Sequence, residues 1–249
     1  MITKAEGGRW LPKAVVFDLD DTLISQSDWL KVAVDRIAVA TARIGLVDEQ
    51  VMRAAMLTTL SEGSDRPGVV DRALQLARPE STGPPEAGLV RVLVAEFMAT
   101  RVPNLKCSPG ARELLHALRD RDIRIGVLSD GRVETQLAKV EDAALTELVD
   151  AILITDSLGG REFRKPNPAG LQVLLERLGC DEPADVLVVG DRPSKDTAVA
   201  HAVGAAAWRV LTGEYASVPD EPAADRVLSS LWSVGDALEV LDAVSDAQR

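Results

Sequence analysis

Aromatic, sulfur-containing and imidazole side chains are all scarce in this sequence. Aromatic residues make up 3% of the 249 residues, so we expect a hydrophobic core built mainly from Ala, Val and Leu. The two cysteines, Cys107 and Cys180, are far apart and match no metal-binding or redox spacing, which predicts reduced thiols. The two histidines, His116 and His201, each stand alone on a helix-like stretch. We expect a packing or surface role for both, which disfavours a catalytic triad that depends on histidine.

Positive charge and long hydrophobic runs are also lacking. Lys and Arg number 28 against 39 Asp and Glu, a net charge of −11, whereas nucleic-acid-binding proteins usually present a basic face. No apolar run approaches the roughly 18 residues of a membrane span, and the best candidate, Leu89–Ala99, contains Arg91 and Glu96. The first residues contain no apolar signal-peptide core. We therefore expect a cytoplasmic protein that binds neither nucleic acid nor membranes, and an anion site would need a local reversal of charge.

Several short apolar runs are typical of strands that are buried on both faces of a sheet. The clearest runs are Lys13–Leu19, Ile123–Leu128, Ala151–Thr155 and Val186–Val189. A weaker run follows at Ala205–Val210. Helical patterns lie between the runs, among them Ala111–Arg119 and Pro168–Leu178, and Gly179 is a stop signal for the second. This alternation predicts an α/β fold with a doubly wound, Rossmann-like parallel sheet.

Residues 27–104 interrupt the alternation, because they contain helical patterns and no strand-like run. The helical stretches are Trp29–Ile44, Glu49–Leu60, Val69–Ala77 and Glu86–Thr100. Loops rich in Pro, Gly and Ser separate them. We expect a helical domain over 27–104, inserted after the first strand into an α/β core formed by 1–26 and 105–249. A final helix is expected over Leu231–Val244.

Carboxylates cluster directly after the first predicted strand, as Asp18, Asp20 and Asp21. Alternation along the strand directs Asp18 and Asp20 to the same side, beyond the carboxyl end where open α/β sheets bind ligands. Their mutual repulsion requires either a cation or a raised pKa. The pattern alone is a weak signal, since a loop with helix-capping aspartates would look the same.

Polar residues also follow the other predicted strands. They are Ser129, Asp130 and Gly131 after the second strand, Lys165 after the third, and Asp191 and Asp196 after the fourth. Gly131 would let backbone N–H groups approach an anion. Lys165 precedes a proline, which favours an extended loop, although a solvated surface lysine would look the same. Asp196 could instead cap a helix.

Together the strand ends predict a metal-dependent site for an anionic group. Carboxylate oxygens from two strand ends form a hard-oxygen site, and Mg²⁺ suits it because Mg²⁺ keeps waters and takes further ligands from a substrate phosphate. An acidic protein that handles an anion needs such a metal and a lysine to invert the local potential. Lys165 is the candidate lysine.

These segments resemble, in type and order, the four motifs of the haloacid dehalogenase superfamily. They are Asp18-x-Asp20-x-Thr22, Ser129, Lys165-Pro166 and Gly190-Asp191-x4-Asp196. The resemblance extends over most of the chain, and the insert at 27–104 is similar to the small helical cap of the superfamily's first cap class. One motif would be a weak signal, but four in order at four strand ends are specific.

The resemblance implies a role for each matching residue. Asp18 would be the nucleophile that becomes an aspartyl phosphate, and Asp20 the acid for the leaving alcohol and then the base for water. Lys165 would balance charge on the nucleophile and the phosphoryl group. The remaining implied roles are phosphate binding by Ser129 and the backbone amides of Asp130 and Gly131, Mg²⁺ binding by the Asp18 and Asp191 carboxylates and the Asp20 carbonyl, orientation of the Asp20 loop by Thr22, and positioning of Lys165 or a metal-bound water by Asp196.

These roles imply a Mg²⁺-dependent phosphatase for a small phosphorylated metabolite, such as a sugar phosphate, a nucleoside monophosphate or phosphoglycolate. The superfamily's dehalogenases lack the second aspartate because carbon–halogen displacement needs no proton donor, so Asp20 favours a phosphate ester. A phosphomutase is an alternative, since it uses the same aspartyl phosphate. A non-catalytic binding protein on this fold is a second alternative, disfavoured by the presence of Asp18, Asp20 and Lys165. The cap is expected to set specificity, and the sequence predicts no oligomeric state.

Overall fold

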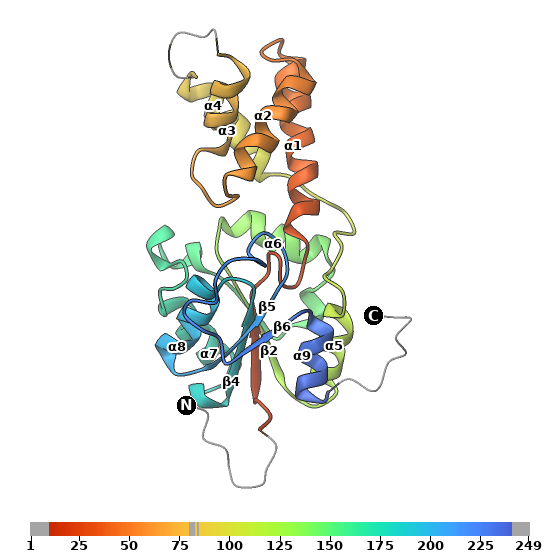
Figure 1. The fold of residues 1–249 in the computed structure, drawn as a ribbon, viewed down its shortest axis with the longest axis vertical. Helices are drawn as coiled ribbons and strands as arrows, with labels where there is room; N and C mark the ends of the chain where they lie inside the picture. The colour runs from red at the N-terminus through yellow and green to blue at the C-terminus, as the bar shows by residue number, and fades with distance from the viewer. Residues whose placement is uncertain (1–9, 80–82, 84, 241–249) are drawn as a thin grey trace. The chain divides into compact units, whose positions relative to one another are not determined.

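A parallel sheet forms the centre of the α/β part of the chain in the computed structural model, which describes residues 10–79, 83 and 85–240. The strands of this described part lie in the order β3-β2-β1-β4-β5-β6, and all neighbours are parallel (Figure 1). Val15 is paired with Ile125 on one side and with Leu187 on the other. The strands are β1 (Ala14–Phe17), β2 (Arg124–Ser129), β3 (Ala151–Ile154), β4 (Val186–Gly190), β5 (Ala206–Val210) and β6 (Arg226–Leu228).

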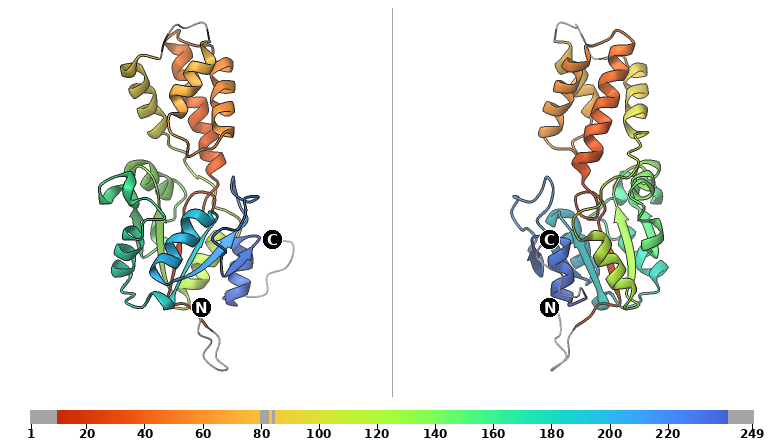
Figure 2. Two further views of the ribbon diagram at one scale, coloured as in Figure 1. Left: turned by 60° about the vertical axis from the view of Figure 1, so that its left-hand side comes forward. Right: turned by 90° about the vertical axis from the view of Figure 1, so that its right-hand side faces the viewer.

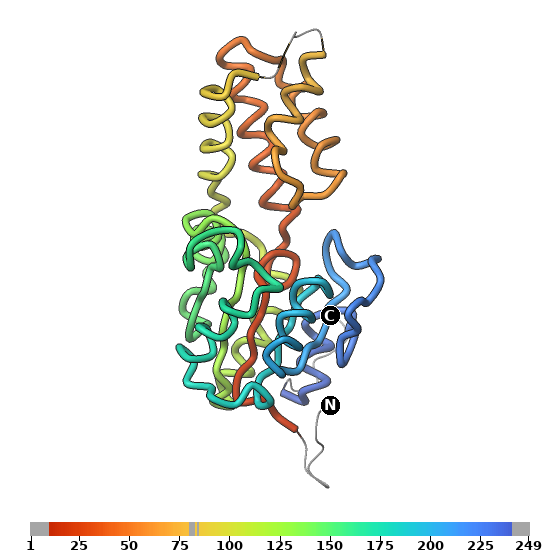
Figure 3. Tube along the Cα trace, turned by 90° about the vertical axis from the view of Figure 1, so that its left-hand side faces the viewer, coloured from red at the N-terminus to blue at the C-terminus, as the bar shows by residue number. Residues whose placement is uncertain are grey.

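The first strand of the sequence lies in the middle of the sheet, as the red segment of Figure 3 shows. Every residue of β1 is fully buried. Its sequence, Ala-Val-Val-Phe, is continuously apolar because both faces of the strand are covered. The chain leaves this apolar strand directly into Asp18, so the strand fixes the position of the first motif.

Helices cover both faces of the sheet. The helices of the α/β part are α5 (Ala111–Arg119), α6 (Val133–Asp142), α7 (Ala169–Leu178), α8 (Ala198–Val203) and α9 (Leu231–Leu238). Figure 1 shows α7 and α8 on one side of the sheet and α5 and α9 on the other. Leu171 and Leu174 of α7 pack with Val16 and Val188 in one core cluster. On the opposite side, Leu115 of α5 is fully buried.

Short helical turns connect several of these elements. They are the 3₁₀ turns η1 (Thr146–Leu148), η2 (Thr155–Leu158), η3 (Arg161–Phe163) and η4 (Pro183–Asp185), and the π-helical turn η5 (Pro193–Thr197). The turn η5 lies between β4 and α8 and contains Asp196. It therefore returns the chain toward the end of the strand that it has just left.

A second compact unit, Asp28–Val102, lies in the sequence between Ser27 and Pro103, which both belong to the first unit. Its helices are α1 (Gln26–Arg43), α2 (Glu49–Ser61), α3 (Val69–Ala77) and α4 (Ala87–Met98). They run alongside one another in both views of Figure 2. Trp29, at the start of α1, meets Phe97 of α4 edge to face, with ring centroids 5.4 Å apart. This unit therefore has an apolar interior of its own.

The predicted fold class is confirmed, since the sheet is parallel and helices flank it. Among the α-helices and strands, the helix α6 and the short, largely exposed strand β6 are not predicted from the sequence. The helix predicted over Leu231–Val244 ends earlier, at Leu238, because Glu239 adopts a left-handed φ of 53°. Residues 241–249 lie outside the described residues. In the part of the chain that the structure describes, no helix is long and apolar enough to cross a membrane.

Candidate active site

The sequence-predicted site residues lie at the carboxyl end of the central strands. Asp18 follows β1 directly, Ser129 is the last residue of β2, and Gly190 is the last residue of β4, with Asp191 next to it. Because β1 is paired with both β2 and β4, these strand ends are adjacent. Lys165 comes from the loop between η3 and α7. The sheet thus gathers these residues at the edge where open α/β proteins bind ligands.

The ammonium group of Lys165 links the segment after β1, which contains Asp18, to the turn that contains Asp196. Its Nζ donates to Asp18 Oδ1 at 2.5 Å, to Asp196 Oδ1 at 2.7 Å and to the carbonyl oxygen of Leu128 at 3.1 Å. All three protons of the ammonium group therefore have acceptors. Burial acts to lower the pKa of Lys165, but the carboxylates of Asp18 and Asp196 outweigh it and raise this pKa. Lys165 consequently stays charged although its side chain is 3% exposed.

Three buried carboxylates lie together in the site, those of Asp18, Asp191 and Asp196, with one oxygen of each within 4.8 Å of the others. Asp196 is fully engaged, since Oδ1 accepts from Lys165 and Oδ2 from the backbone N–H of Arg192 at 3.0 Å. Asp191 Oδ1 is buried, and no group of the described residues donates to it. An orphaned carboxylate oxygen beside a second carboxylate suits a hard divalent cation. Asp18 and Asp191 therefore fit as ligands of Mg²⁺.

This cluster carries more negative charge than Lys165 can neutralise. Burial raises the pKa of Asp191 to about 9, and the charges of Asp18 and Asp196 act in the same direction. Burial also raises the pKa of Asp18 to about 7, against the opposing effect of Lys165. A cation bound between these carboxylates would favour their ionised forms.

The carboxylate of Asp20 is held by helix α6. Lys139 Nζ lies 2.7 Å from Oδ1 and 2.8 Å from Oδ2 of Asp20. Gln136 Nε2 donates to Asp20 Oδ2 at 2.8 Å and to Ser129 Oγ at 2.6 Å. Neither Gln136 nor Lys139 is predicted from the sequence. The available signal is their spacing of three residues, which places two polar side chains on one helix face shortly after Ser129.

Asp130 joins three segments through its carboxylate. Oδ1 accepts from Thr155 Oγ1 at 2.9 Å and from the backbone N–H of Lys165 at 3.0 Å, while Oδ2 accepts from Lys195 Nζ at 2.9 Å. Burial acts to raise the pKa of Asp130, but the charges of Lys165 and Lys195 outweigh it and lower this pKa. The carboxylate is thus engaged within the protein. What Asp130 and Gly131 can offer to an anion is their backbone N–H groups, and Gly131 has the glycine-favouring φ of 131°.

The loop after β1 is anchored through Asp21. Its carboxylate accepts from the backbone N–H of Gln26 at 3.0 Å and from that of Glu214 at 3.2 Å, and the Thr212 hydroxyl donates to its carbonyl oxygen. The hydroxyl of Thr22 is buried and has no hydrogen-bond partner within the described ranges. No hydrogen bond among the described residues therefore supports the expected orientation of this loop by Thr22. Asp21, in contrast, links the loop to the segment after β5.

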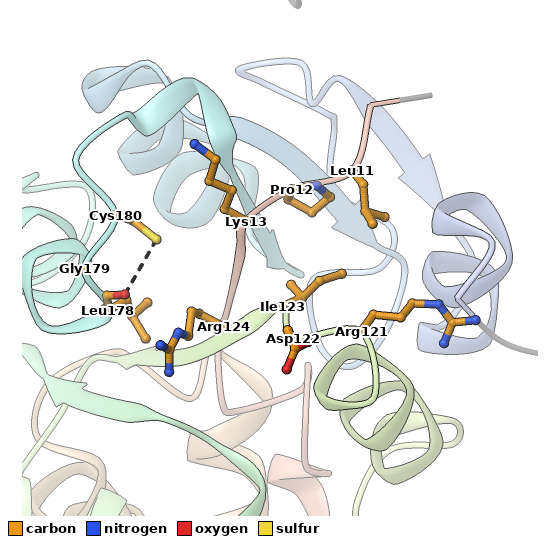
Figure 4. A pocket seen from close by; sticks show the side chains of 10 residues that line it. All are labelled: Leu11, Pro12, Lys13, Arg121, Asp122, Ile123, Arg124, Leu178, Gly179 and Cys180. Carbon is orange, nitrogen blue, oxygen red and sulfur yellow. Dashed lines mark hydrogen bonds between the residues drawn. The ribbon is translucent and has the colours of Figure 1, made fainter. Parts of the chain in front are cut away.

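A separate cavity of about 510 Å³ lies at the opposite, amino end of β1 and β2 (Figure 4). Lys13, Arg121 and Arg124 are among the residues that line it. Lys13 forms an ion pair with Asp185 at 2.6 Å, and both side chains are largely or partly exposed. None of the sequence-predicted site residues lines this cavity, so it is distinct from the candidate active site.

A family model described as a haloacid dehalogenase-like hydrolase matches residues 12–204. The chain belongs to this family. The matched range begins before β1 and ends after α8, so it contains every predicted site residue from Asp18 to Asp196. The resemblance stated from the four motifs is thereby confirmed.

Named members of this haloacid dehalogenase-like family include phosphatases similar to this chain. The glyceraldehyde 3-phosphate phosphatase of Methanopyrus kandleri is 27% identical over 241 residues, which cover 95% of this chain and 99% of that protein. The phosphoglycolate phosphatase of Rhodospirillum rubrum is 32% identical over 198 residues, 78% of this chain and 77% of that one. Among solved structures, the HAD-hydrolase YfnB of Bacillus subtilis, bound to magnesium, has a TM-score of 0.66 at 17% identity, covering 93% of this chain and 100% of that chain.

The raised pKa values predict that stability depends on pH and metal together. Asp18 and Asp191 bind protons more tightly in the folded chain than at the ordinary value of 3.8, so the metal-free protein should lose stability as pH rises from about 4 to about 9. Mg²⁺ binds the ionised carboxylates, so the increase in melting temperature that it causes should grow over this range. Thermal melts with Mg²⁺ and with EDTA at several pH values measure this. An increase that is equal at every pH, or that persists in Asp191→Asn, would contradict the proposed ligands.

The close approach of Asp196 to β4 predicts that a side chain at position 190 lowers both stability and activity. A Cβ at Gly190 would overlap the carboxyl group of Asp196, so Gly190→Ala should displace this partner of Lys165. We expect a loss of about 1–3 kcal/mol in the free energy of unfolding and a loss of most activity per folded molecule. Gly126→Ala is the matched control, because its Cβ would meet the side chains of Leu174 and Leu178, remote from the site. If both variants keep equal activity per folded molecule, the packing of Asp196 against Gly190 is not needed for activity.

Proposed function

We propose that this protein is a Mg²⁺-dependent phosphatase that hydrolyses a small phosphorylated metabolite through an aspartyl phosphate on Asp18. The observation that carries the proposal is the Asp18 carboxylate, 2.5 Å from Lys165 Nζ and beside Asp191, whose buried Oδ1 has no donor within the described residues. A nucleophile, a fixed positive charge and a carboxylate oxygen that suits a hard cation are thus adjacent. The phosphatase relatives and the magnesium bound to YfnB support the proposal.

In the first half of the proposed reaction, a carboxylate oxygen of Asp18 attacks phosphorus and the ester oxygen departs. Lys165 offsets the negative charge of Asp18 and of the approaching phosphoryl group. The carboxylates of Asp18 and Asp191 and the carbonyl of Asp20 would hold Mg²⁺, which supplies positive charge that lessens the repulsion between these carboxylates and an anionic substrate. Ser129 and the backbone N–H groups of Asp130 and Gly131 hold the phosphoryl oxygens.

Asp20 handles the protons in both halves of the reaction. It gives a proton to the departing alkoxide, which forms the free alcohol, and then takes a proton from the water that attacks the aspartyl phosphate. The second step releases phosphate and regenerates Asp18. This need for a proton donor is why Asp20 favours a phosphate ester over a carbon–halogen bond, whose halide leaves without a proton. A phosphomutase uses the same first half and is the alternative that the chemistry of the site allows.

The substrate is proposed to be a small phosphate ester of the kind that the relatives' names describe, such as glyceraldehyde 3-phosphate or phosphoglycolate. Sugar phosphates and nucleoside monophosphates are the other candidates from the sequence. We assign the choice among them to the helical unit Asp28–Val102, as the cap of this family member. The α/β part would then supply the chemistry that all these substrates share.

The proposed activity predicts phosphate release that depends on metal and on Asp18. Purified protein should release inorganic phosphate over many turnovers from at least one compound of a panel of phosphorylated metabolites and 4-nitrophenyl phosphate. EDTA should abolish the release and Mg²⁺ restore it, because two buried carboxylates otherwise repel the substrate. Asp18→Asn, which keeps the size but removes the charge of the nucleophile, should fall to the background rate with an unchanged circular dichroism spectrum. Undiminished release by the folded variant or in EDTA would refute the mechanism.

Replacement of Asp20 predicts a trapped intermediate. Asp20→Asn lacks the base for water but leaves Asp18 able to attack 4-nitrophenyl phosphate, whose leaving group needs no proton. The variant should therefore accumulate one covalent phosphate on Asp18, seen as a mass increase that hydroxylamine removes. Asp18→Asn/Asp20→Asn is the control that should show none. A wild-type protein that transfers the group to a sugar hydroxyl faster than to water would instead be a phosphomutase.

A further inference from the structure

Helix α6 carries two buried polar side chains that take part in none of the chemical steps of the proposed reaction. Gln136 and Lys139 are each 3% exposed, although neither residue type is commonly buried in this way. Both reach residues that are distant in the sequence, since Lys139 is 119 positions from Asp20 and Gln136 is 116. A buried polar side chain is costly unless it is hydrogen-bonded, so these contacts are features that the fold maintains.

Gln136 connects the proposed acid and base to the proposed phosphate-binding hydroxyl. In its ionised form the Asp20 carboxylate can only accept hydrogen bonds, so the amide group of Gln136 presents its nitrogen there, which agrees with the 2.8 Å contact from Nε2 to Oδ2. The second N–H of the same nitrogen donates to Ser129 Oγ at 2.6 Å. Because Ser129 Oγ accepts this bond, its own proton is directed elsewhere and can be donated to a phosphoryl oxygen. Gln136 thus sets the donor direction of Ser129.

Lys139 determines the orientation of the Asp20 carboxylate. Its Nζ contacts both oxygens, at 2.7 and 2.8 Å, and Gln136 contacts Oδ2 as well. Two donors on different turns of one helix restrict rotation of the carboxylate about its χ angles. The Lys139 side chain is buried and that of Asp20 is 20% exposed, so solvent screens the pair only weakly on the lysine side.

Gly131 provides the space in which Gln136 lies. A Cβ at Gly131 would come within 3.3 Å of Gln136 Cγ, closer than side chains normally pack. The glycine that exposes backbone N–H groups after β2 therefore also admits the Gln136 side chain. The segment Ser129–Gly131 and helix α6 therefore depend on each other for their packing.

We propose that Gln136 and Lys139 are positioning residues that aim the Asp20 carboxylate at the ester oxygen and the Ser129 hydroxyl at the phosphoryl group. The inference rests on the proposed function, because it concerns the proton transfer that this function needs. Neither residue is assigned a contact with the substrate. Their effect is exerted through Asp20 and Ser129, so it should be largest for substrates whose leaving group depends on a proton from Asp20.

Two matched substrates test this directly, phenyl phosphate and 4-nitrophenyl phosphate. They are similar in size, but the phenolate of the first is the more basic leaving group and needs the proton more. For Lys139→Met and Gln136→Leu, we expect kcat/KM for phenyl phosphate to fall at least about tenfold more than kcat/KM for 4-nitrophenyl phosphate, within the range that general acid catalysis contributes. Lys13→Met is the control, because it removes a lysine from an ion pair at the amino end of the sheet, and it should leave the ratio unchanged.

Loss of folding cannot mimic this result, because fewer folded molecules lower both rates equally. Gln136→Leu changes no charge, so it can be measured even if Lys139→Met fails to fold. An unchanged ratio of the two rates in a folded variant would overturn the inference. If the wild-type protein hydrolyses neither these nor any other phosphate ester, the proposed function itself fails.

A double-mutant cycle shows whether Lys139 acts through Asp20. In Asp20→Asn the proton donor is already absent, so adding Lys139→Met should change the first-turnover release of 4-nitrophenol and of phenol by less than about twofold each. In the protein that keeps Asp20, the same Lys139→Met change should lower phenol release selectively. Equal effects of Lys139→Met with and without Asp20 would mean that Lys139 acts elsewhere, and the positioning role would be rejected.

Discussion

One buried ammonium group beside three buried carboxylates is the constraint on which the candidate active site depends. A buried charge without a partner costs several kcal/mol, so Lys165 can occupy its place only while Asp18, Asp196 and the Leu128 carbonyl remain within hydrogen-bonding distance. These acceptors come from the ends of β1 and β2 and from the turn η5. The ion-pair geometry and the spacing of the strands therefore stabilise each other. The excess negative charge that this arrangement leaves is also what makes the site suitable for a cation.

The same dependence explains why much of the site can be predicted from the sequence. Asp18, Ser129 and Asp191 each lie at the end of a buried strand, and continuous apolar runs mark such strands in the sequence. Parallel strands end on one edge, so residues that follow different strands must converge there. Lys165 could not be predicted from the strand pattern alone, because most lysines in loops are solvated surface residues. Its place within the ordered set of motifs identified it, and the structure puts it 2.5 Å from Asp18.

What the sequence could not predict depends on polar burial and on short elements. The buried side of α6 contains Thr135, Gln136 and Lys139, so apolar periodicity, which marks the other helices, is weak there. The strand β6 has three residues with an exposed pattern and no apolar run. The hydrogen bond from Glu214 to the Asp21 carboxylate requires Asp21 to lie against Gly213. These two segments are almost two hundred positions apart in the sequence. Contacts of this kind can be found only in the folded chain, because no local sequence pattern predicts them.

The central position of β1 has a consequence for how the protein is made. Strand β1 is synthesised before the other strands of the sheet, and its neighbours β2 and β4 begin only at Arg124 and Val186. At roughly 5–20 residues per second, the apolar strand and the aspartates that follow it wait on the order of ten seconds for their second neighbour. Asp18 and Lys165 are 147 positions apart, so the carboxylate of Asp18 cannot be buried with its counter-charge until Lys165 has been synthesised. The central strand thus delays assembly of the charged site until β4 and η5 have been synthesised, and until then the apolar segment of β1 lacks at least one of its two neighbouring strands.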